Sequence, residues 1–326
     1  MSGLSDSFQR PVDYLRVSVT DRCNMRCVYC VPPQGVRFLP RSEVLSYEEI
    51  RTVVEVAAKM GISKVRLSGG EPLVRIGITA LVRMLASVKG IDDISLTTNG
   101  LLLSQYAAGL KEAGLRRVNV SLDTLRQERF STITGHEGLD QVLHGLKAAR
   151  EAGLNPVKVN MVVMRGINDD EVGDFALRSI RDGWHVRFIE LMPFTTHSAG
   201  ETQFIGIPEV KQRLEFLGPL EPFRSIKGNG PARYYRFSGA TGTIGFISPV
   251  SEHFCFGCNR LRLTADGRLR PCLLNDHEID VKSALRGGDR AGLERLIREA
   301  VASKPRQHLL TQGQRPGGRA MTQIGG

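Results

Sequence analysis

Apolar and polar residues alternate in six short runs along the first two-thirds of the chain, and stretches of helical character separate these runs. The alternating runs span residues 15–19, 65–67, 94–96, 118–120, 157–163 and 186–192. Residues 47–60 and 139–152 place apolar side chains at helical spacing, and each stretch stops before a glycine, Gly61 and Gly153. Strands that alternate with helices predict βαβ units and a parallel sheet.

The polar residues of these predicted strands share one face, because side chains at positions i and i+2 of a strand point to the same side. The polar face of the first five runs carries Arg16 and Ser18; Lys64, Arg66 and Ser68; Ser95 and Thr97; Asn119 and Ser121; and Lys158 and Asn160. A parallel strand covered by helices on both sides is normally apolar throughout. A continuous polar face therefore indicates a wet, cationic cavity inside a barrel-like sheet, with a sheet facing solvent as the alternative.

Six such strands predict an α/β fold with an incomplete (β/α)6 barrel of the TIM type, whose active site lies at the C-terminal ends of the strands. From about Pro193 the alternation gives way to glycine- and proline-rich sequence with short strand-like pieces. We expect the barrel core to span residues 6–225 and a smaller C-terminal iron–sulfur domain to span residues 226–326. Composition alone predicts a disordered tail over the glycine-rich residues 313–326.

Length and composition limit the kind of protein. The 326 residues are 41% hydrophobic, which is enough for a large core. No stretch approaches the ~18 consecutive apolar residues of a membrane span, and the N-terminus lacks the apolar region of a secretory signal. We therefore expect a cytoplasmic protein that does not bind a membrane. The net charge of +10 favours an anionic partner, either a nucleic acid or a nucleotide.

The six cysteines fall into two groups, the first set (Cys23, Cys27 and Cys30) and the second set (Cys255, Cys258 and Cys272). Short spacings suit a shared metal centre better than disulfides, which a chain of this size does not need. Three thiolates can hold three corners of a [4Fe–4S] cluster and leave the fourth iron open. The alternative is zinc, including a Cys3His site completed by His253 or His277 in a zinc-ribbon nucleic-acid-binding protein.

The first set resembles the signature of the radical S-adenosylmethionine (SAM) superfamily. It reads Cys-x3-Cys-x2-Cys with an aromatic residue, Tyr29, before the last cysteine. Residues 68–72, Ser-Gly-Gly-Glu-Pro, resemble the glycine-rich segment of that superfamily, and glycine is expected where backbone approaches a ligand closely. The resemblance implies a [4Fe–4S] cluster that binds SAM and releases a 5′-deoxyadenosyl radical. It implies cofactor contacts from Tyr29, Gly70, Ser121 and Met192.

The second set resembles the C-terminal cluster site of the GTP 3′,8-cyclase family, lyases that catalyse the first step of molybdenum cofactor (molybdopterin) biosynthesis. The similarity lies in residues 255–272, with further matches at 15–23, 97–100, 118–123, 158–160, 187–193 and 325–326. This resemblance implies a second [4Fe–4S] cluster whose open iron contacts the guanine base of GTP. The radical would abstract the ribose C3′ hydrogen, and C3′ would attack guanine C8 to give (8S)-3′,8-cyclo-7,8-dihydroguanosine 5′-triphosphate.

The resemblance to this family also implies individual roles and partners. The implied GTP contacts are Arg16, Arg66, Thr97, Lys158, Arg260, Leu261 and Arg262, of which the guanidinium groups suit phosphate. The tail would thread into the active site with Gly325 and Gly326 as catalytic residues. The implied partners are GTP, an external electron donor and the next pathway enzyme, cyclic pyranopterin monophosphate synthase, with no nucleic acid. The chain would be a monomer or a homodimer.

The nearest rival is another radical SAM enzyme with an auxiliary cluster, such as a peptide-modifying maturase. Auxiliary sites of that kind usually carry more than three cysteines, whereas the second set has three. The zinc-ribbon alternative leaves the first set and the shared polar strand face unexplained. Both alternatives therefore account for less of the sequence than a nucleotide cyclase does.

Overall fold

The computed structural model describes residues 3–194, 201–224, 226, 230–312 and 314–325. Its framework is one curved sheet of twelve strands in the order β12-β11-β10-β1-β2-β3-β4-β5-β6-β9-β8-β7. The six central strands run parallel and are β1 (Tyr14–Ser18), β2 (Lys64–Ser68), β3 (Asp93–Thr98), β4 (Arg117–Ser121), β5 (Lys158–Val163) and β6 (His185–Glu190). Because the sheet has two edges, at β12 and β7, the barrel is incomplete, which confirms the predicted fold class.

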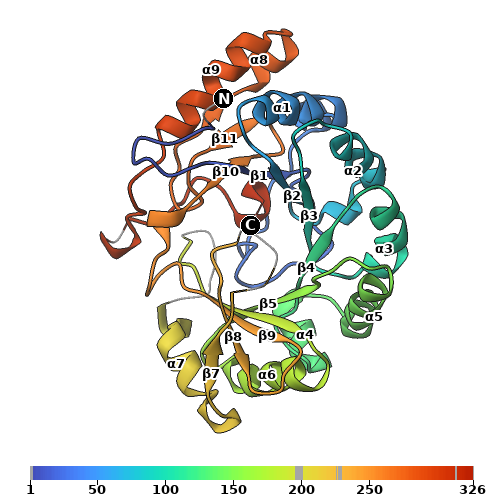
Figure 1. Cartoon of the computed structure of the whole chain (residues 1–326), viewed down its shortest axis with the longest axis vertical. Helices are drawn as coiled ribbons and strands as arrows, with labels where there is room; N and C mark the ends of the chain where they lie inside the picture. Colours follow the sequence, from blue (N-terminus) through green and yellow to red (C-terminus); the bar gives the residue numbers. More distant parts are fainter. Residues whose placement is uncertain (1–2, 195–200, 225, 227–229, 313, 326) are drawn as a thin grey trace.

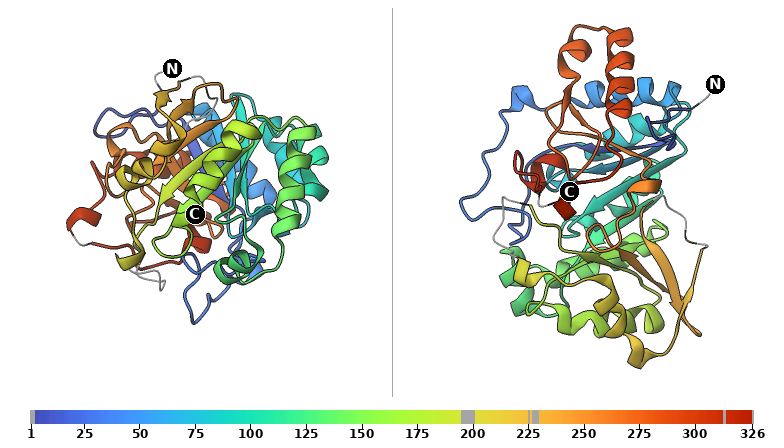
Figure 2. Two further views of the ribbon diagram at one scale, coloured as in Figure 1. Left: turned by 90° about the horizontal axis from the view of Figure 1, so that it is seen from below. Right: turned by 90° about the vertical axis from the view of Figure 1, so that its left-hand side faces the viewer.

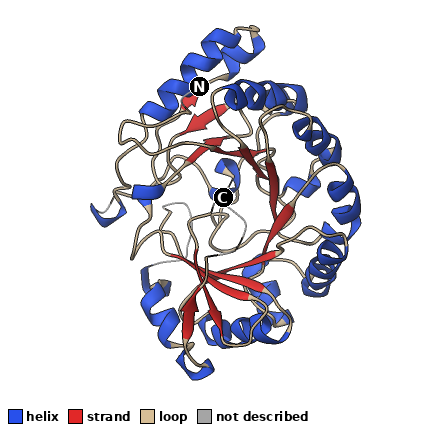
Figure 3. Cartoon of the chain, in the orientation of Figure 1, coloured by secondary structure: helices blue, strands red, loops and turns tan. Residues whose placement is uncertain are grey.

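Helices cover the convex side of this sheet (Figures 1 and 3). They are α1 (Tyr47–Lys59), α2 (Ile78–Ala86), α3 (Leu103–Glu112), α4 (Gln127–Thr134), α5 (Leu139–Glu151) and α6 (Val172–Arg181). Helix α1 begins with a capping box in which the Ser46 hydroxyl accepts from the Glu49 amide at 3.1 Å and the Glu49 carboxylate accepts from the Ser46 amide at 2.7 Å. The predicted stops are confirmed, since Gly61 and Gly153 adopt left-handed φ values of 107° and 74° just beyond α1 and α5.

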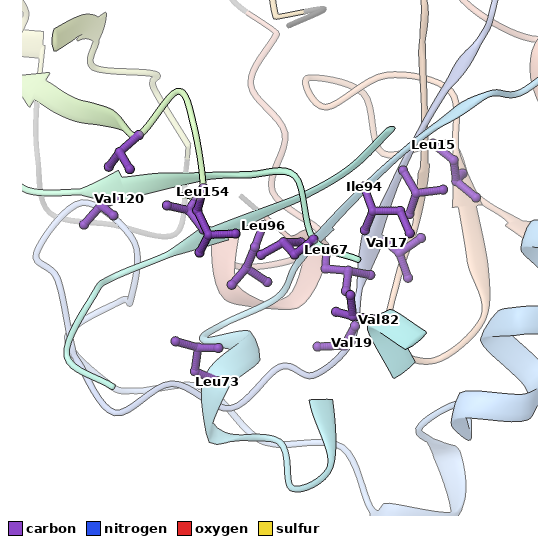
Figure 4. Packing of buried hydrophobic residues seen from close by; sticks show 14 of the residues in the cluster. Leu15, Val17, Val19, Leu67, Leu73, Val82, Ile94, Leu96, Val120 and Leu154 are labelled. Carbon is purple, nitrogen blue, oxygen red and sulfur yellow. The ribbon is translucent and has the colours of Figure 1, made fainter. Parts of the chain in front are cut away.

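The main hydrophobic core lies between the strands and these helices. Figure 4 shows Val17, Leu67, Ile94 and Leu96 from neighbouring strands gathered with Val82 of α2 in one cluster. These side chains are the apolar half of the alternation, so the polar half faces the concave side of the sheet. The predicted cavity inside a barrel-like sheet is confirmed, and the alternative of a sheet facing solvent is wrong, because the concave face surrounds a cavity described below.

The C-terminal part of the chain extends the sheet at both ends. Its strands are β7 (Leu220–Pro222), β8 (Arg233–Phe237), β9 (Thr243–Ile247), β10 (Arg260–Leu263), β11 (Arg268–Arg270) and β12 (Ile279–Asp280). Strand β9 lies parallel to β6, and β10 lies parallel to β1. Its helices are α7 (Ile207–Gln212), α8 (Lys282–Arg286), α9 (Arg290–Ala302) and α10 (Met321–Ile324). The domain boundary after residue 225 stays a prediction, although strands from beyond it belong to the same sheet as the core.

The glycine-rich tail is ordered in the described range 314–325, so the expectation from composition is wrong. Met321 and Ile324 of α10 are buried against Phe194 and Leu274, and this apolar contact holds the tail in place. Arg319 pairs with Asp266 at 2.9 Å and with Glu278 at 2.8 Å. As a result α10 lies within the curve of the sheet (Figures 1 and 2). No described helix has the length and apolar character needed to cross a membrane.

Candidate active site

Both cysteine sets border adjoining cavities on the concave side of the sheet. The first set lines the larger cavity together with residues from the polar faces of β1 to β6. The second set lines a smaller cavity, and the two cavities share Met192, Arg260 and Arg262 among their walls. Residues separated by more than 200 positions in the sequence therefore border one continuous region.

The first set lies on a loop that follows β1 and is fixed by backbone hydrogen bonds. The Cys30 amide donates to the Cys27 carbonyl at 2.9 Å, and the Arg26 amide donates to the Thr134 carbonyl at 2.7 Å. Burial raises the pKa of Cys23 to about 11 and that of Cys30 to about 12. These thiols ionise only when a positive group, such as iron, binds them.

The arrangement of both sets fits a cluster better than a single metal ion. One zinc ion requires donors that converge on a point, and within the described ranges no three His, Cys, Asp or Glu side chains do so. A [4Fe–4S] cluster instead takes each thiolate at a separate iron, and the three cysteines of each set surround a common cavity. His277 is exposed and the His253 ring packs edge-on against His308 at 5.5 Å. The geometry therefore gives no support to the Cys3His zinc alternative.

Two buried carboxylates border the first set. Asp123 accepts from the Tyr29 hydroxyl at 2.6 Å and from the Val162 amide at 2.8 Å, and burial raises its pKa to about 6. Glu71 accepts from the Asn99 amide at 2.6 Å and from the Thr98 hydroxyl at 2.8 Å, and burial raises its pKa to about 7. These bonds fasten the cysteine loop and the glycine-rich segment to the ends of β3, β4 and β5.

Gly70 is required by packing between two loops. A Cβ atom at this position would lie 2.3 Å from the carbonyl oxygen of Arg22, directly beside Cys23. The Gly70 amide donates to the Thr20 carbonyl at 2.7 Å. Only glycine lets the segment 68–72 approach the cysteine loop this closely.

A group of cations faces the cavity from neighbouring strands; Arg66, Arg187 and Arg262 are buried and Arg16 is half-buried. Arg16 donates to the Ser68 hydroxyl at 3.1 Å, Arg66 to the Ser95 hydroxyl at 3.2 Å, and Arg187 to the Asn119 side chain at 2.6 Å. Within the described residues, Arg16, Arg66, Arg187 and Arg262 form no ion pair with a carboxylate. Burial is costly for unpaired charges, so this surface is built to receive an anion.

Lys158, a predicted GTP contact, is buried on β5 and does not line either cavity, although the charges of this cationic group act on it. Burial lowers its pKa to about 6, and the charges of Arg187, Arg117 and Arg66 add to this effect. Burial likewise lowers the pKa of Arg262 to about 10, with a further contribution from Arg260. In both cases burial is the larger cause of the lowered pKa, and the neighbouring positive charges add to it.

The structure brings most of the predicted site residues together. Tyr29, Gly70, Ser121, Met192, Arg16, Arg66, Thr97, Arg260 and Arg262 all line the larger cavity. The Gly325 carbonyl accepts from the Arg262 guanidinium at 3.1 Å and from the Ser68 hydroxyl at 3.3 Å. Leu261 is different, because its side chain packs in the main core behind β10. Gly326 lies outside the described residues.

Sequence reasoning missed three residues at this site. Arg187 shares the polar face of β6, and extending the alternation to that strand would have identified it. Asp123 follows β4 within a motif that was matched without a role being assigned to it. Lys304 lies in the loop after α9 and contacts the second set, and no pattern in the sequence singles it out.

Comparison with known proteins gives two family matches that together cover most of the chain. Residues 17–178 match the Radical SAM superfamily, and residues 184–310 match the family described as Molybdenum Cofactor Synthesis C. A GTP 3′,8-cyclase from Pelotomaculum thermopropionicum is 53% identical over 326 residues, covering 99% of this chain and 100% of the relative. A GTP 3′,8-cyclase from Moorella thermoacetica is 51% identical over 324 residues, with the same coverage of both chains.

Solved structures support the fold alone. Streptococcus suis SuiB bound to S-adenosylmethionine superposes with a TM-score of 0.60 at 15% identity, over 89% of this chain and 68% of that one. The fold and the first set thus define a radical SAM enzyme, which carries [4Fe–4S] clusters and uses SAM. Because full-length relatives are about half identical, the chain belongs to the GTP 3′,8-cyclase family.

Proposed function

We propose that this chain converts GTP to (8S)-3′,8-cyclo-7,8-dihydroguanosine 5′-triphosphate, the first step of molybdenum cofactor biosynthesis. The observation that carries this proposal is the pair of adjoining cavities, with one cysteine set at each and with Arg260 and Arg262 in the walls of both. A radical enzyme that acts on a nucleoside triphosphate needs the cluster sites and the phosphate-binding cations beside the same cavity. Family membership supports the same reaction.

The first set would hold the cluster that binds SAM, with Tyr29, Gly70, Ser121 and Met192 as the cofactor contacts. When bound there, the cluster and SAM supply the 5′-deoxyadenosyl radical. The chain contributes a fixed position for the cofactor at the ends of the strands. The hydrogen bond from Tyr29 to Asp123 holds the wall of this cavity against β4.

The second set would hold the cluster that contacts guanine, and the cations would bind the triphosphate. We assign Arg16, Arg66 and Lys158 to the phosphates and Arg260 and Arg262 to the end of the nucleotide near the second set. Thr97 contributes a hydroxyl beside the Asn119 amide, which lies 3.5 Å away. Leu261 contributes through its backbone, since its side chain lies in the core.

The tail would place Gly325 and Gly326 at the reacting end of the substrate, with Gly325 held by Arg262. We further propose that an external electron donor reduces the enzyme and that cyclic pyranopterin monophosphate synthase takes the product. In this proposal residues 6–225 form the SAM-binding core and residues 226–326 form the substrate-binding domain of a monomer or homodimer. Its place in the cell would be the cytoplasm.

One anaerobic experiment tests the proposed reaction. The protein is reconstituted with iron and sulfide, its iron and zinc are counted, and GTP, SAM and a reductant are then added. We expect 5′-deoxyadenosine to form while GTP is consumed. Chromatography measures both compounds. Bound zinc in place of iron, or 5′-deoxyadenosine without GTP consumption, would refute the proposal.

A further inference from the structure

Lys304 joins the two segments that carry most of the second set. It follows α9 and is buried, with 3% of its surface exposed. Its ammonium donates to the carbonyl oxygens of Arg260 at 2.7 Å and Pro271 at 2.9 Å, and it lies 3.7 Å from the sulfur of Cys258. These three acceptors match the three N–H groups of a lysine. Arg260 comes two residues after Cys258, and Pro271 directly precedes Cys272, so one side chain links both segments.

The charge of Lys304 has no carboxylate partner among the described residues. Its charged or ionisable neighbours are Cys258, Cys272, Arg10 and Arg260, so the cysteines are the available source of negative charge. A buried ammonium without a compensating anion is strongly unfavourable. A cluster ligated by thiolates carries the negative charge that this position lacks.

The segment around Lys304 is itself anchored to the second set. The Arg10 guanidinium donates to the Cys255 carbonyl at 2.6 Å, and to the carbonyls of Pro305 at 2.7 Å and Arg306 at 3.0 Å. Arg10 also pairs with Asp6 at 2.6 Å, so its own charge is compensated within the protein. Arg10 thus fixes the position of the Lys304 segment relative to Cys255. It does not compensate the positive charge of Lys304.

We propose that Lys304 is a positioning residue of the second set, which fastens the segments of Cys258 and Cys272 and compensates the negative charge of the cluster bound there. This inference rests on the proposed function only in requiring an iron–sulfur cluster on the second set. A nearby positive charge stabilises the reduced, more negative form of a cluster. Lys304 therefore raises the reduction potential of the second cluster and helps the protein to retain it.

The test uses the full-length chain with the first set replaced by alanine, so that iron signals report the second set alone. Lys304→Met and Lys304→Gln remove the charge, and Gln keeps a hydrogen-bond donor. Lys304→Arg keeps the charge. Lys147→Met is the matched control, since it removes one charge from an exposed side chain on α5. Iron and sulfide are counted after reconstitution, and the midpoint potential is measured by a redox titration followed by electron paramagnetic resonance.

We expect both neutral variants to lose iron and their remaining cluster to titrate at a more negative potential. Lys304→Arg and Lys147→Met should keep the parent potential. An unchanged potential in both neutral variants would overturn the proposal, even with less iron bound, because a contact that only fastens two loops predicts that result. If Lys304→Met does not fold, the comparison of Lys304→Gln with Lys304→Arg gives the same answer.

These measurements use neither GTP nor SAM, so the proposal for Lys304 and the proposed reaction can be refuted separately. A wild-type chain that binds two clusters but consumes no GTP would refute the cyclase function and leave the result for Lys304 intact. A second set that binds no iron would overturn both proposals.

Discussion

The two cysteine sets differ in the charge of the ionisable side chains nearest to them. Buried carboxylates, Asp123 and Glu71, border the first set, whereas Arg260 and Lys304 contact the second. Burial alone would raise the pKa of Cys258, but the charges of Arg260 and Lys304 outweigh it and lower the pKa to about 6. Negative surroundings make a cluster a stronger reductant, and positive surroundings favour an anionic ligand. This contrast supports the proposed division into a half that donates an electron, at the first set, and a half that binds substrate, at the second set.

The largest expected effect comes from removing one ligand of either set. Cys27→Ala should abolish both 5′-deoxyadenosine formation and GTP consumption, since it removes the cluster that binds SAM. Cys258→Ala should abolish GTP consumption and leave SAM cleavage measurable. The 5′-deoxyadenosine formed and the GTP consumed are quantified by chromatography after anaerobic reconstitution. Equal loss of 5′-deoxyadenosine in the two variants would remove the proposed division of labour.

The tail connects the two halves, because the Gly325 carbonyl contacts Ser68 on one side and Arg262 on the other. Deletion of Gly325 and Gly326 should abolish GTP cyclisation and spare iron content and SAM cleavage. Gly325→Ala should also impair cyclisation, because its φ is 70° and a Cβ would lie 2.8 Å from the Ser68 hydroxyl.

Gly318→Ala is the matched control for the tail variants. A Cβ at that position would lie 3.5 Å from its nearest neighbour, an ordinary contact with Asp276. This variant should cyclise GTP at the wild-type rate. Full activity of the deletion variant would show that the tail has no part in the reaction.

A smaller effect is expected from Lys158, whose protonation should be coupled to GTP binding. Below its pKa of about 6 Lys158 is already charged, and above it GTP binding must restore a proton that burial and the neighbouring arginines removed. Binding at pH 7.5 should therefore take up a proton, and GTP affinity should fall as pH rises, by at most about tenfold per pH unit. Calorimetry in two buffers with different ionisation enthalpies measures the uptake. Lys158→Met should abolish the difference between the buffers, and equal heats for the wild type would contradict the prediction.

The smallest effect concerns the acidic half. Burial raises the pKa of Asp123 from 3.8 to about 6, so the folded protein binds its proton more tightly than the unfolded chain. The corresponding stability is present below about pH 4 and is lost as pH rises through about 6. Asp123→Asn should flatten this fall in the melting temperature of the metal-free protein and cost about 1–2 kcal/mol at low pH through weaker bonding to Tyr29. An identical pH dependence in both proteins would exclude Asp123 as its source.

Local patterns in the sequence predicted the central sheet and much of the site. Alternation alone placed Arg16, Arg66 and Lys158 on one polar face, because the side-chain period of a strand is fixed by backbone geometry. The same rule places Leu261 on the opposite face from Arg260 and Arg262, which explains why its side chain lies in the core.

Features that depend on contacts between distant segments could not be predicted in this way. The pairing of β10 with β1 and the burial of Lys304 arise from packing of the C-terminal part on the core. The tail was misjudged from composition because its order comes from a few contacts. These are the apolar packing of Met321 and Ile324 and the ion pairs of Arg319.

The position of β10 also imposes an order on synthesis. Strand β1 pairs with β2 on one edge and with β10 on the other, and Leu15 lies opposite Leu261. On the ribosome β1 to β6 emerge first, so this edge of β1 stays unpaired until most of the chain has been translated. The second set, which flanks β10, comes into position only when this late part of the chain has been made. Until then this edge of β1 is open to pairing with other strands.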